Sequence, residues 1–139
     1  MNRTPFVLGL TLAVGIALGI IGTQVLNAPS AQQEPFKRTL LLKTDLQGLE
    51  GQEAHMMIVD IAPGARSGKH YHSGPVLAYT LSGSGSWDAE GMPPKALEPG
   101  TTLYVPPKQV HEDVGGPSGE KLLAIFIVPK GQPLTVPVK

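Results

Sequence analysis

Six short apolar segments, separated by clusters of glycine and proline, constrain the fold of this 139-residue chain more than any other feature. Each segment has the length and the apolar or β-branched content of a β-strand. The clusters between them are turn formers, and no helical periodicity appears outside the N-terminal region. Short strands at this spacing predict an all-β, single-domain sandwich or barrel without internal repeats. The predicted strands are 38–43, 54–61, 76–81, 84–88, 101–105 and 121–128.

Three histidines form the most informative local pattern in this predicted domain. His70 and His72 are two residues apart, so on a strand they point to the same face, and His111 must then approach from another strand. Neutral imidazole is a common ligand of divalent metals, and three such ligands leave open positions for water or substrate. The pattern predicts one open metal site formed by His70, His72 and His111. The alternative is a barrel whose pocket binds no metal.

The spacing around these histidines resembles the two motifs of the cupin family. The first motif is G-x5-H-x-H-x3,4-E-x6-G, and the second is G-x5-P-x-G-x2-H-x3-N. The resemblance covers the chain from about Lys37 to Lys139. It implies a double-stranded β-helix, or jelly-roll barrel, that holds one divalent ion of Fe, Zn, Cu, Ni or Mn and takes a small-molecule ligand or substrate. The positions that match are Gly64, His70, His72 and Gly83 in the first motif, and Gly100, Pro106 and His111 in the second.

Three positions depart from the family pattern. Val76 stands in place of the glutamate, Lys108 in place of the second-motif glycine, and Gly115 in place of the asparagine. Because Val76 cannot coordinate, an ion held by three neutral ligands keeps its double charge, which favours an anionic or chelating ligand. The change also removes a general base. By the same resemblance, three-histidine cupins bind iron for thiol or diketone oxidation.

Strand parity predicts which other side chains face the cavity. If the alternation set by the first-motif histidines resumes at Val76, then Val76, Ala78 and Thr80 face inward and Tyr79 faces outward. Gly64, Gly83 and Gly100 are interpreted as turn residues that tolerate positive φ. Aromatic residues near the motifs are expected to pack in the core or in a subunit interface. They are Tyr71, Tyr79, Trp87 and Tyr104.

Four polar residues have two interpretations each. Glu112 and Asp113 either hydrogen-bond a ligand imidazole or, as the more common case, are loop carboxylates in water. Lys108 is either a solvated surface lysine or an anion-attracting group at the pocket mouth. His55 belongs to neither motif and is interpreted as an ordinary strand histidine, with a supporting role at the site as the alternative.

The N-terminal region has a different composition. The stretch 5–26 is almost wholly apolar, and its length suffices for a membrane-spanning helix. Residues 1–28 are predicted to be a signal anchor or, alternatively, a cleaved signal peptide with a loose small-residue site at Ala28-Pro29-Ser30. Residues 29–36 form a predicted linker and residues 37–139 the cupin domain. The domain is therefore expected outside the cytoplasm, anchored to the membrane or released, with a cytoplasmic orientation as the third possibility.

Composition narrows the function further. The formal net charge is zero and no basic stripe appears, which argues against nucleic-acid binding. Cysteine is absent, so neither disulfides nor thiolate ligands are available. We expect an extracytoplasmic metal-binding cupin that acts as a dioxygenase-like enzyme on a small polar molecule. The alternative is a non-catalytic barrel that binds or senses a metal or small ligand. A homodimer is compatible with so small a barrel.

Overall fold

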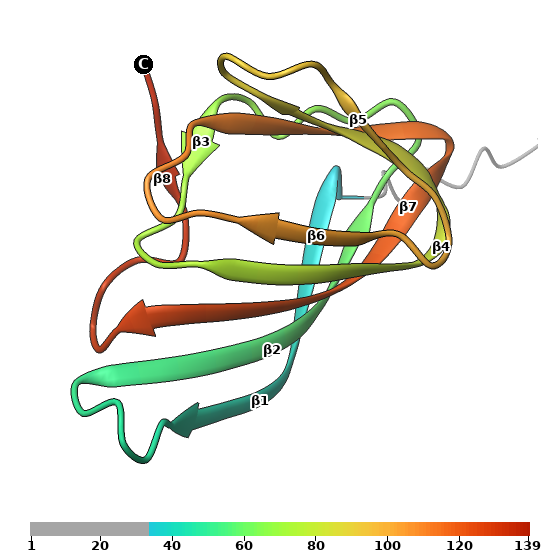
Figure 1. The fold of residues 1–139 in the computed structure, drawn as a ribbon. Helices are drawn as coiled ribbons and strands as arrows, with labels where there is room; N and C mark the ends of the chain where they lie inside the picture. Colours follow the sequence, from blue (N-terminus) through green and yellow to red (C-terminus); the bar gives the residue numbers. More distant parts are fainter. Residues whose placement is uncertain (1–33) are drawn as a thin grey trace, which may run out of the picture. The chain divides into compact units, whose positions relative to one another are not determined.

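The computed structural model describes residues 34–139, which fold as one curled antiparallel β-sheet without helices (Figure 1). The predicted all-β cupin barrel is thereby confirmed. The predicted N-terminal helix, whether signal or anchor, lies outside the described residues, and residues 34–139 hold no helix long and apolar enough to cross a membrane. The strands are β1 Phe36–Asp45, β2 Gln52–Ile61, β3 His70–Tyr71, β4 Val76–Ala89, β5 Lys95–Leu97, β6 Thr102–Val105, β7 His111–Pro129 and β8 Val136–Pro137.

Two long strands, β4 and β7, shape the sheet. They pair antiparallel from Val76 with Phe126 to Ala89 with His111, and each turns sharply so that it runs through both layers of the curled sheet (Figure 1). The register shifts between Thr80 and Ser82 and again between Gly83 and Gly85. Such irregularities increase local bending of a strand. The predicted strands 76–81 and 84–88 are therefore one bent strand, and the strand predicted at 121–128 begins ten residues earlier, at His111.

Glycines make the bends possible. Gly83 has a φ of 78°, a left-handed conformation that is strained for other residues. A Cβ atom on Gly115 would lie 2.4 Å from the carbonyl oxygen of Ala62 and 3.0 Å from Cγ2 of Ile61. This close approach explains why Gly115 stands where the family has asparagine, because no side chain fits there. Gly64 and Gly100 also have positive φ, of 68° and 92°, as predicted.

The inner face of the curled sheet carries the hydrophobic core. Side chains alternate along the strands as the pleat requires, so that Val76 is 3% exposed while its neighbour Leu77 is 46% exposed. β2, β4, β6 and β7 all contribute to this face. The same alternation continues toward the histidines, so the core and the candidate site share one inner surface. Its most buried apolar members include Val59, Ile61, Val76, Val105, Ala124, Phe126 and Val128.

Candidate metal centre

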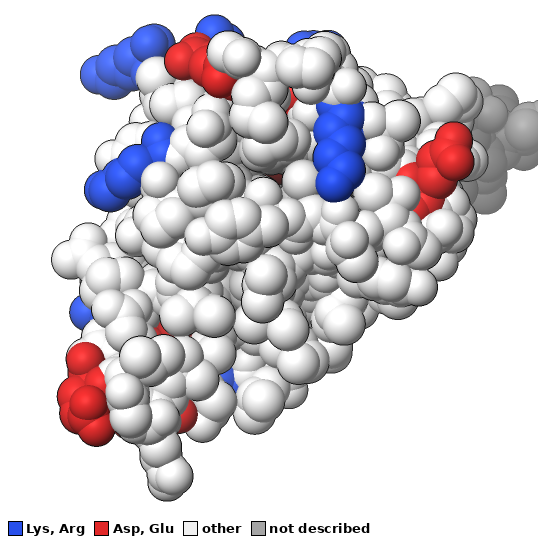
Figure 2. Space-filling view, in the orientation of Figure 1, with Lys and Arg blue, Asp and Glu red and all other residues white. Residues whose placement is uncertain are grey.

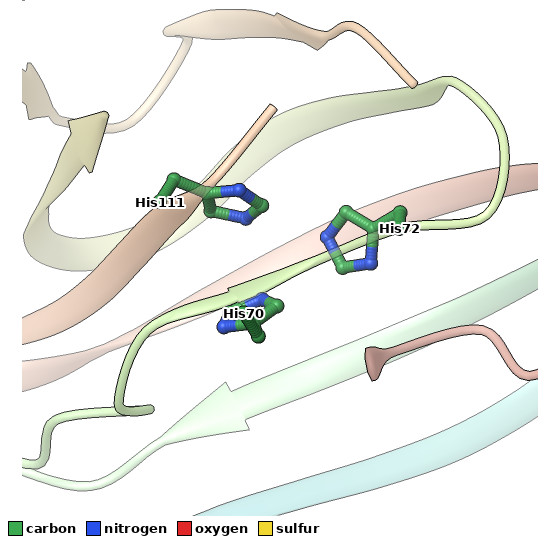
Figure 3. Close-up of side chains that lie close together, drawn as sticks. All are labelled: His70, His72 and His111. Atoms are coloured by element: carbon green, nitrogen blue, oxygen red, sulfur yellow. The ribbon is translucent and has the colours of Figure 1, made fainter. Parts of the chain in front are cut away.

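The three predicted histidines meet inside the curled sheet. His70 lies on β3, His72 directly follows that strand, and His111 opens β7. β3 pairs with β7 at His70 and His111, which places these two residues directly opposite one another. All three side chains are buried, their ring centroids are 4.3–5.0 Å apart, and the rings surround one space (Figure 3). One nitrogen of each ring lies within 4.8 Å of the others, so the group could hold a metal ion.

Each imidazole is oriented by a backbone carbonyl. The Nδ1 atom of every ring lies at hydrogen-bond distance from a carbonyl oxygen, which can only accept, so Nδ1 must carry the proton. The Nε2 atom of each neutral ring then presents its lone pair. This arrangement fixes the tautomer and the ring direction that metal ligation requires. The pairs are His70 with Gly68 at 2.9 Å, His72 with Leu134 at 2.8 Å, and His111 with Gln109 at 2.9 Å.

Burial also favours the neutral form of the rings. Desolvation lowers the pKa of His72 to about 3, although its bond to the Leu134 carbonyl opposes this change. Desolvation likewise lowers the pKa of His111, against the opposing effects of its backbone bond and Asp113. Aromatic rings pack on the same imidazoles, with Phe126 5.1 Å from His72 and Trp87 5.7 Å from His111. Neutral imidazoles are what a metal ion needs from this group.

The loop that precedes β3 is tied to β7. Arg66 forms an ion pair with Glu112, and the Gly68 amide donates to the same carboxylate at 3.2 Å. The hydroxyl of Ser67 accepts the Asp113 amide at 2.9 Å and lies 3.3 Å from Nδ1 of His70. Glu112 is therefore neither a solvated loop carboxylate nor a partner of a ligand imidazole. It holds the loop that carries His70 against the strand that carries His111.

Asp113 corrects the interpretation of a loop carboxylate in water. It lies on β7 two residues after His111, so both side chains point to the inner face. One carboxylate oxygen, Oδ2, lies 3.7 Å from Nε2 of His70 and 3.9 Å from Nε2 of His111, and only 20% of the side chain is exposed. Burial raises the pKa of Asp113, while the two histidines oppose that rise.

A cavity of about 40 Å³ opens beside the histidines. One water molecule requires about 10–15 Å³ on the same measure, so the space suits an ion with a few waters or a very small ligand. Apart from the three histidines, its polar lining is Arg38 and Asp113. In the view of Figure 2 the surface is mainly uncharged, with charged side chains scattered singly or in small groups. The apolar lining is Phe36, Val59, Ile61, Val76, Ala78, Leu103, Val105, Leu122, Ala124 and Phe126.

The parity prediction for β4 is largely correct. Val76 and Ala78 line the cavity, and Tyr79 faces outward with 44% exposure. Thr80 also faces inward but lies beyond the cavity, where its hydroxyl donates to Glu120 at 3.1 Å. Trp87 is buried as expected, whereas Tyr79 and Tyr104 are exposed within the described part of the chain.

Two further polar residues lie away from the cavity lining. His55 pairs with Glu53 at 2.8 Å on β2, as an ordinary strand histidine does. The Nζ atom of Lys108 lies 4.8 Å from the centre of the Tyr71 ring rather than at the pocket. Lys108 also has a φ of 64°, which explains why the family has glycine at this position.

Sequence reasoning missed Arg38 as a cavity residue. Its charge was considered only for membrane orientation, yet β1 places it on the cavity lining together with Phe36. The two residues are two apart on one strand, so alternation was the available signal. Which face of β1 would meet the histidines was not readable from the local sequence, because it depends on the pairing of β1 with β2.

Comparison with known proteins defines the family. The model of the Cupin domain matches residues 57–128, more than half of the chain, so the chain belongs to the cupin family. The dimethylsulfoniopropionate lyase DddW of Ruegeria pomeroyi is 30% identical over 96 residues, which cover 67% of this chain and 62% of that protein. The chain thus spans less than two thirds of this curated relative.

Solved structures show the same fold at low sequence identity. The DMSP lyase DddQ of Ruegeria pomeroyi has a TM-score of 0.63 at 17% identity, over 81% of this chain and 56% of that one. A cupin superfamily protein of Desulfitobacterium hafniense has a TM-score of 0.58 at 19% identity, over 70% and 82% of the two chains. These likenesses support the curled cupin sheet and assign no reaction to the chain.

Proposed function

We propose that the chain binds one divalent metal ion through His70, His72 and His111 and acts as a metal-dependent enzyme on a small anionic molecule. The observation that carries the proposal is the convergence of three buried imidazoles whose Nδ1 atoms are engaged by backbone carbonyls. An ion held there would act as a Lewis acid at its open positions. Arg38 on the cavity lining supports an anionic ligand, because guanidinium pairs well with carboxylate.

Metal content tests the site directly. The full chain, purified without a histidine tag, is expected to hold close to one metal ion per chain by mass spectrometry. Each of His70→Ala, His72→Ala and His111→Ala is expected to lose it. His55→Ala is the matched control, because His55 is a partly buried strand histidine outside the group. A chain that takes up no metal after loading, or that loses it equally in the control, refutes the proposed site.

Two reaction classes remain for the enzyme. The similarity to a dimethylsulfoniopropionate lyase favours elimination, and the resemblance to three-histidine cupins favours oxidation by iron and oxygen. Turnover of dimethylsulfoniopropionate by the metal-loaded chain tests the first. Oxygen consumption by the iron-loaded chain with thiols and diketones tests the second. Activity in either assay that is lost in His111→Ala establishes an enzyme and its class.

A non-catalytic binding barrel is the second candidate. The observation that favours it is the cavity itself, which is small and, within the described residues, contains Asp113 as its one carboxylate. An acid–base reaction that needs two protein groups is poorly served by such a lining. Stable metal binding without turnover across both substrate panels, but with a shift in metal affinity on adding a small anion, is the result expected of a carrier or sensor.

We also propose an extracytoplasmic location. The apolar run at 5–26 and the polar stretch that follows it support export, with residues 29–36 as the tether and 37–139 as the domain. In bacterial cells, the full chain is expected to be degraded by protease added to spheroplasts. The intact mass of the purified chain distinguishes a retained anchor from a cleaved signal peptide. Protection from protease in intact spheroplasts, with digestion after lysis, contradicts export.

A further inference from the structure

The carboxylate of Asp113 occupies an unusual position between two of the candidate ligands. Its Oδ2 atom lies 3.7 Å from Nε2 of His70 and 3.9 Å from Nε2 of His111. Both separations exceed hydrogen-bond length. Within residues 34–139, no hydrogen bond to this carboxylate is formed, although its backbone amide is bonded to Ser67. A largely buried carboxylate without a donor requires some other cation or donor at this point.

The histidines do not supply that donor. The Nδ1 atoms of His70 and His111 are engaged by carbonyl oxygens, so the Nε2 atoms that face Asp113 carry lone pairs in the neutral rings. Two lone pairs and a carboxylate oxygen therefore converge on one point of a mainly apolar cavity. These electron-rich groups repel one another unless a cation lies between them. The arrangement matches the ligand shell of an ion.

The separations also fit one ion. Ligand nitrogen and oxygen atoms lie about 2.0–2.2 Å from zinc and similar divalent ions, so two ligands of one ion are at most about 4.4 Å apart. The distances of 3.7 Å and 3.9 Å fall inside this limit. Glu112, the adjacent carboxylate, points to the opposite side of β7 and pairs with Arg66. Asp113 is thus the inward member of the pair, on the same face as His111.

We propose that Asp113 is the fourth protein ligand of the metal ion and supplies the negative charge that the glutamate supplies in other cupins. The inference rests on the proposed three-histidine site. It changes the expected charge, because a divalent ion with three neutral ligands and one carboxylate carries a net charge of one rather than two. The family places its carboxylate at the start of β4, where this chain has Val76. Here the carboxylate comes from β7.

Cobalt substitution with a cysteine reporter tests the inference. The chain contains no cysteine, so Asp113→Cys introduces a single thiol. If the side chain at 113 reaches the ion, cobalt loading of the full-length variant produces a thiolate-to-cobalt charge-transfer band in the near ultraviolet. Glu112→Cys is the matched control, because it places the thiol on the same strand but on the opposite face, and no such band is expected.

Cobalt affinity gives a second, independent measurement. Asp113→Asn keeps the side-chain shape and is expected to weaken cobalt binding by at least about 100-fold, beyond the range usual for a residue that only supports a ligand. Glu112→Gln is expected to retain the wild-type affinity within a few fold. Competition with a coloured chelator measures all of these affinities.

The outcomes separate the two proposals. The band in Asp113→Cys together with weakened binding in Asp113→Asn supports Asp113 as a ligand. A wild-type chain that binds one cobalt ion, with no band in Asp113→Cys and unchanged affinity in Asp113→Asn, overturns the inference and leaves the three-histidine site intact. Asp113→Asn serves as the isosteric test should the cysteine variant not fold. A wild-type chain that binds no cobalt, zinc or iron overturns both proposals.

Discussion

Glu120 should make the stability of this domain depend on pH. Its side chain lies on the inner face of β7 and the residue is 4% exposed, with Thr80 donating to Oε1 at 3.1 Å. The other oxygen, Oε2, has no hydrogen-bond partner among the described residues. Burial raises the pKa of Glu120 from 4.5 to about 7, against the opposing effect of the Thr80 hydroxyl. The folded protein therefore holds this proton more tightly than the unfolded chain does.

The direction and size of the effect follow from linkage. Stability from this group is complete below pH 4.5 and is lost as the pH rises from 4.5 to about 7, because ionisation favours the unfolded chain over that range. Between pH 5 and pH 8.5 the loss amounts to about 2–3 kcal/mol. The value is an upper limit, since Glu120 also borders a surface cavity of about 350 Å³ that water can enter.

Urea unfolding of Glu120→Gln measures this term. The variant is neutral at every pH, so its free energy of unfolding should rise relative to wild type by about 2–3 kcal/mol between pH 5 and pH 8.5. A chelator in both samples removes any contribution from bound metal. Glu98→Gln, at an exposed position, is the control for a solvated carboxylate. A difference between Glu120→Gln and wild type that is the same at both pH values would show that Glu120 ionises freely in the folded protein and refute the reasoning.

Three further perturbations test other features of the fold. Lys108→Gly should be about 1 kcal/mol more stable than Lys108→Ala by urea unfolding, because φ is 64° there and only glycine adopts it without strain; equal stabilities contradict the assignment of strain. Gly115→Ala should lose about 2–4 kcal/mol, because its Cβ would lie 2.4 Å from a backbone oxygen, whereas Gly131→Ala, with open space around it, should lose about 1 kcal/mol. Metal at 100 times its dissociation constant should add about 2.7 kcal/mol to stability, and a chelator or His111→Ala should abolish the gain in a thermal melt.

Much of the fold was predictable because its signals are local. Turn formers and alternating apolar residues located the main strands, and β3 was anticipated through the spacing of His70 and His72. The bends were not predicted. Glycines at 83–85 and 115–117 look like chain reversals in the sequence, yet the strands continue through them because bulges let a paired strand bend without ending.

The candidate site was predictable in part for the same reason. His70, His72 and His111 carry a specific spacing, and the structure brings them together. Asp113 was hidden because the Gly115-Gly116-Pro117 turn signal implied that its strand began later, which removed the parity that joins it to His111. Arg38 was hidden because its place beside the cavity depends on the pairing of β1 with β2, a contact between distant segments.

Val76 and Asp113 account for one another in physical terms. A second carboxylate at position 76 would share a cavity of about 40 Å³ with Asp113, and two negative charges at this separation in an apolar lining are costly. With the charge supplied from β7, the β4 side of the cavity is free to be apolar, and Val76, Ala78 and the facing Val105 make it so. The cavity therefore has an apolar wall on β4 and β6 and a polar side formed by the histidines, Asp113 and Arg38. A ligand with an anionic head and a short apolar tail fits this division, with its head toward the metal and its tail against Val76.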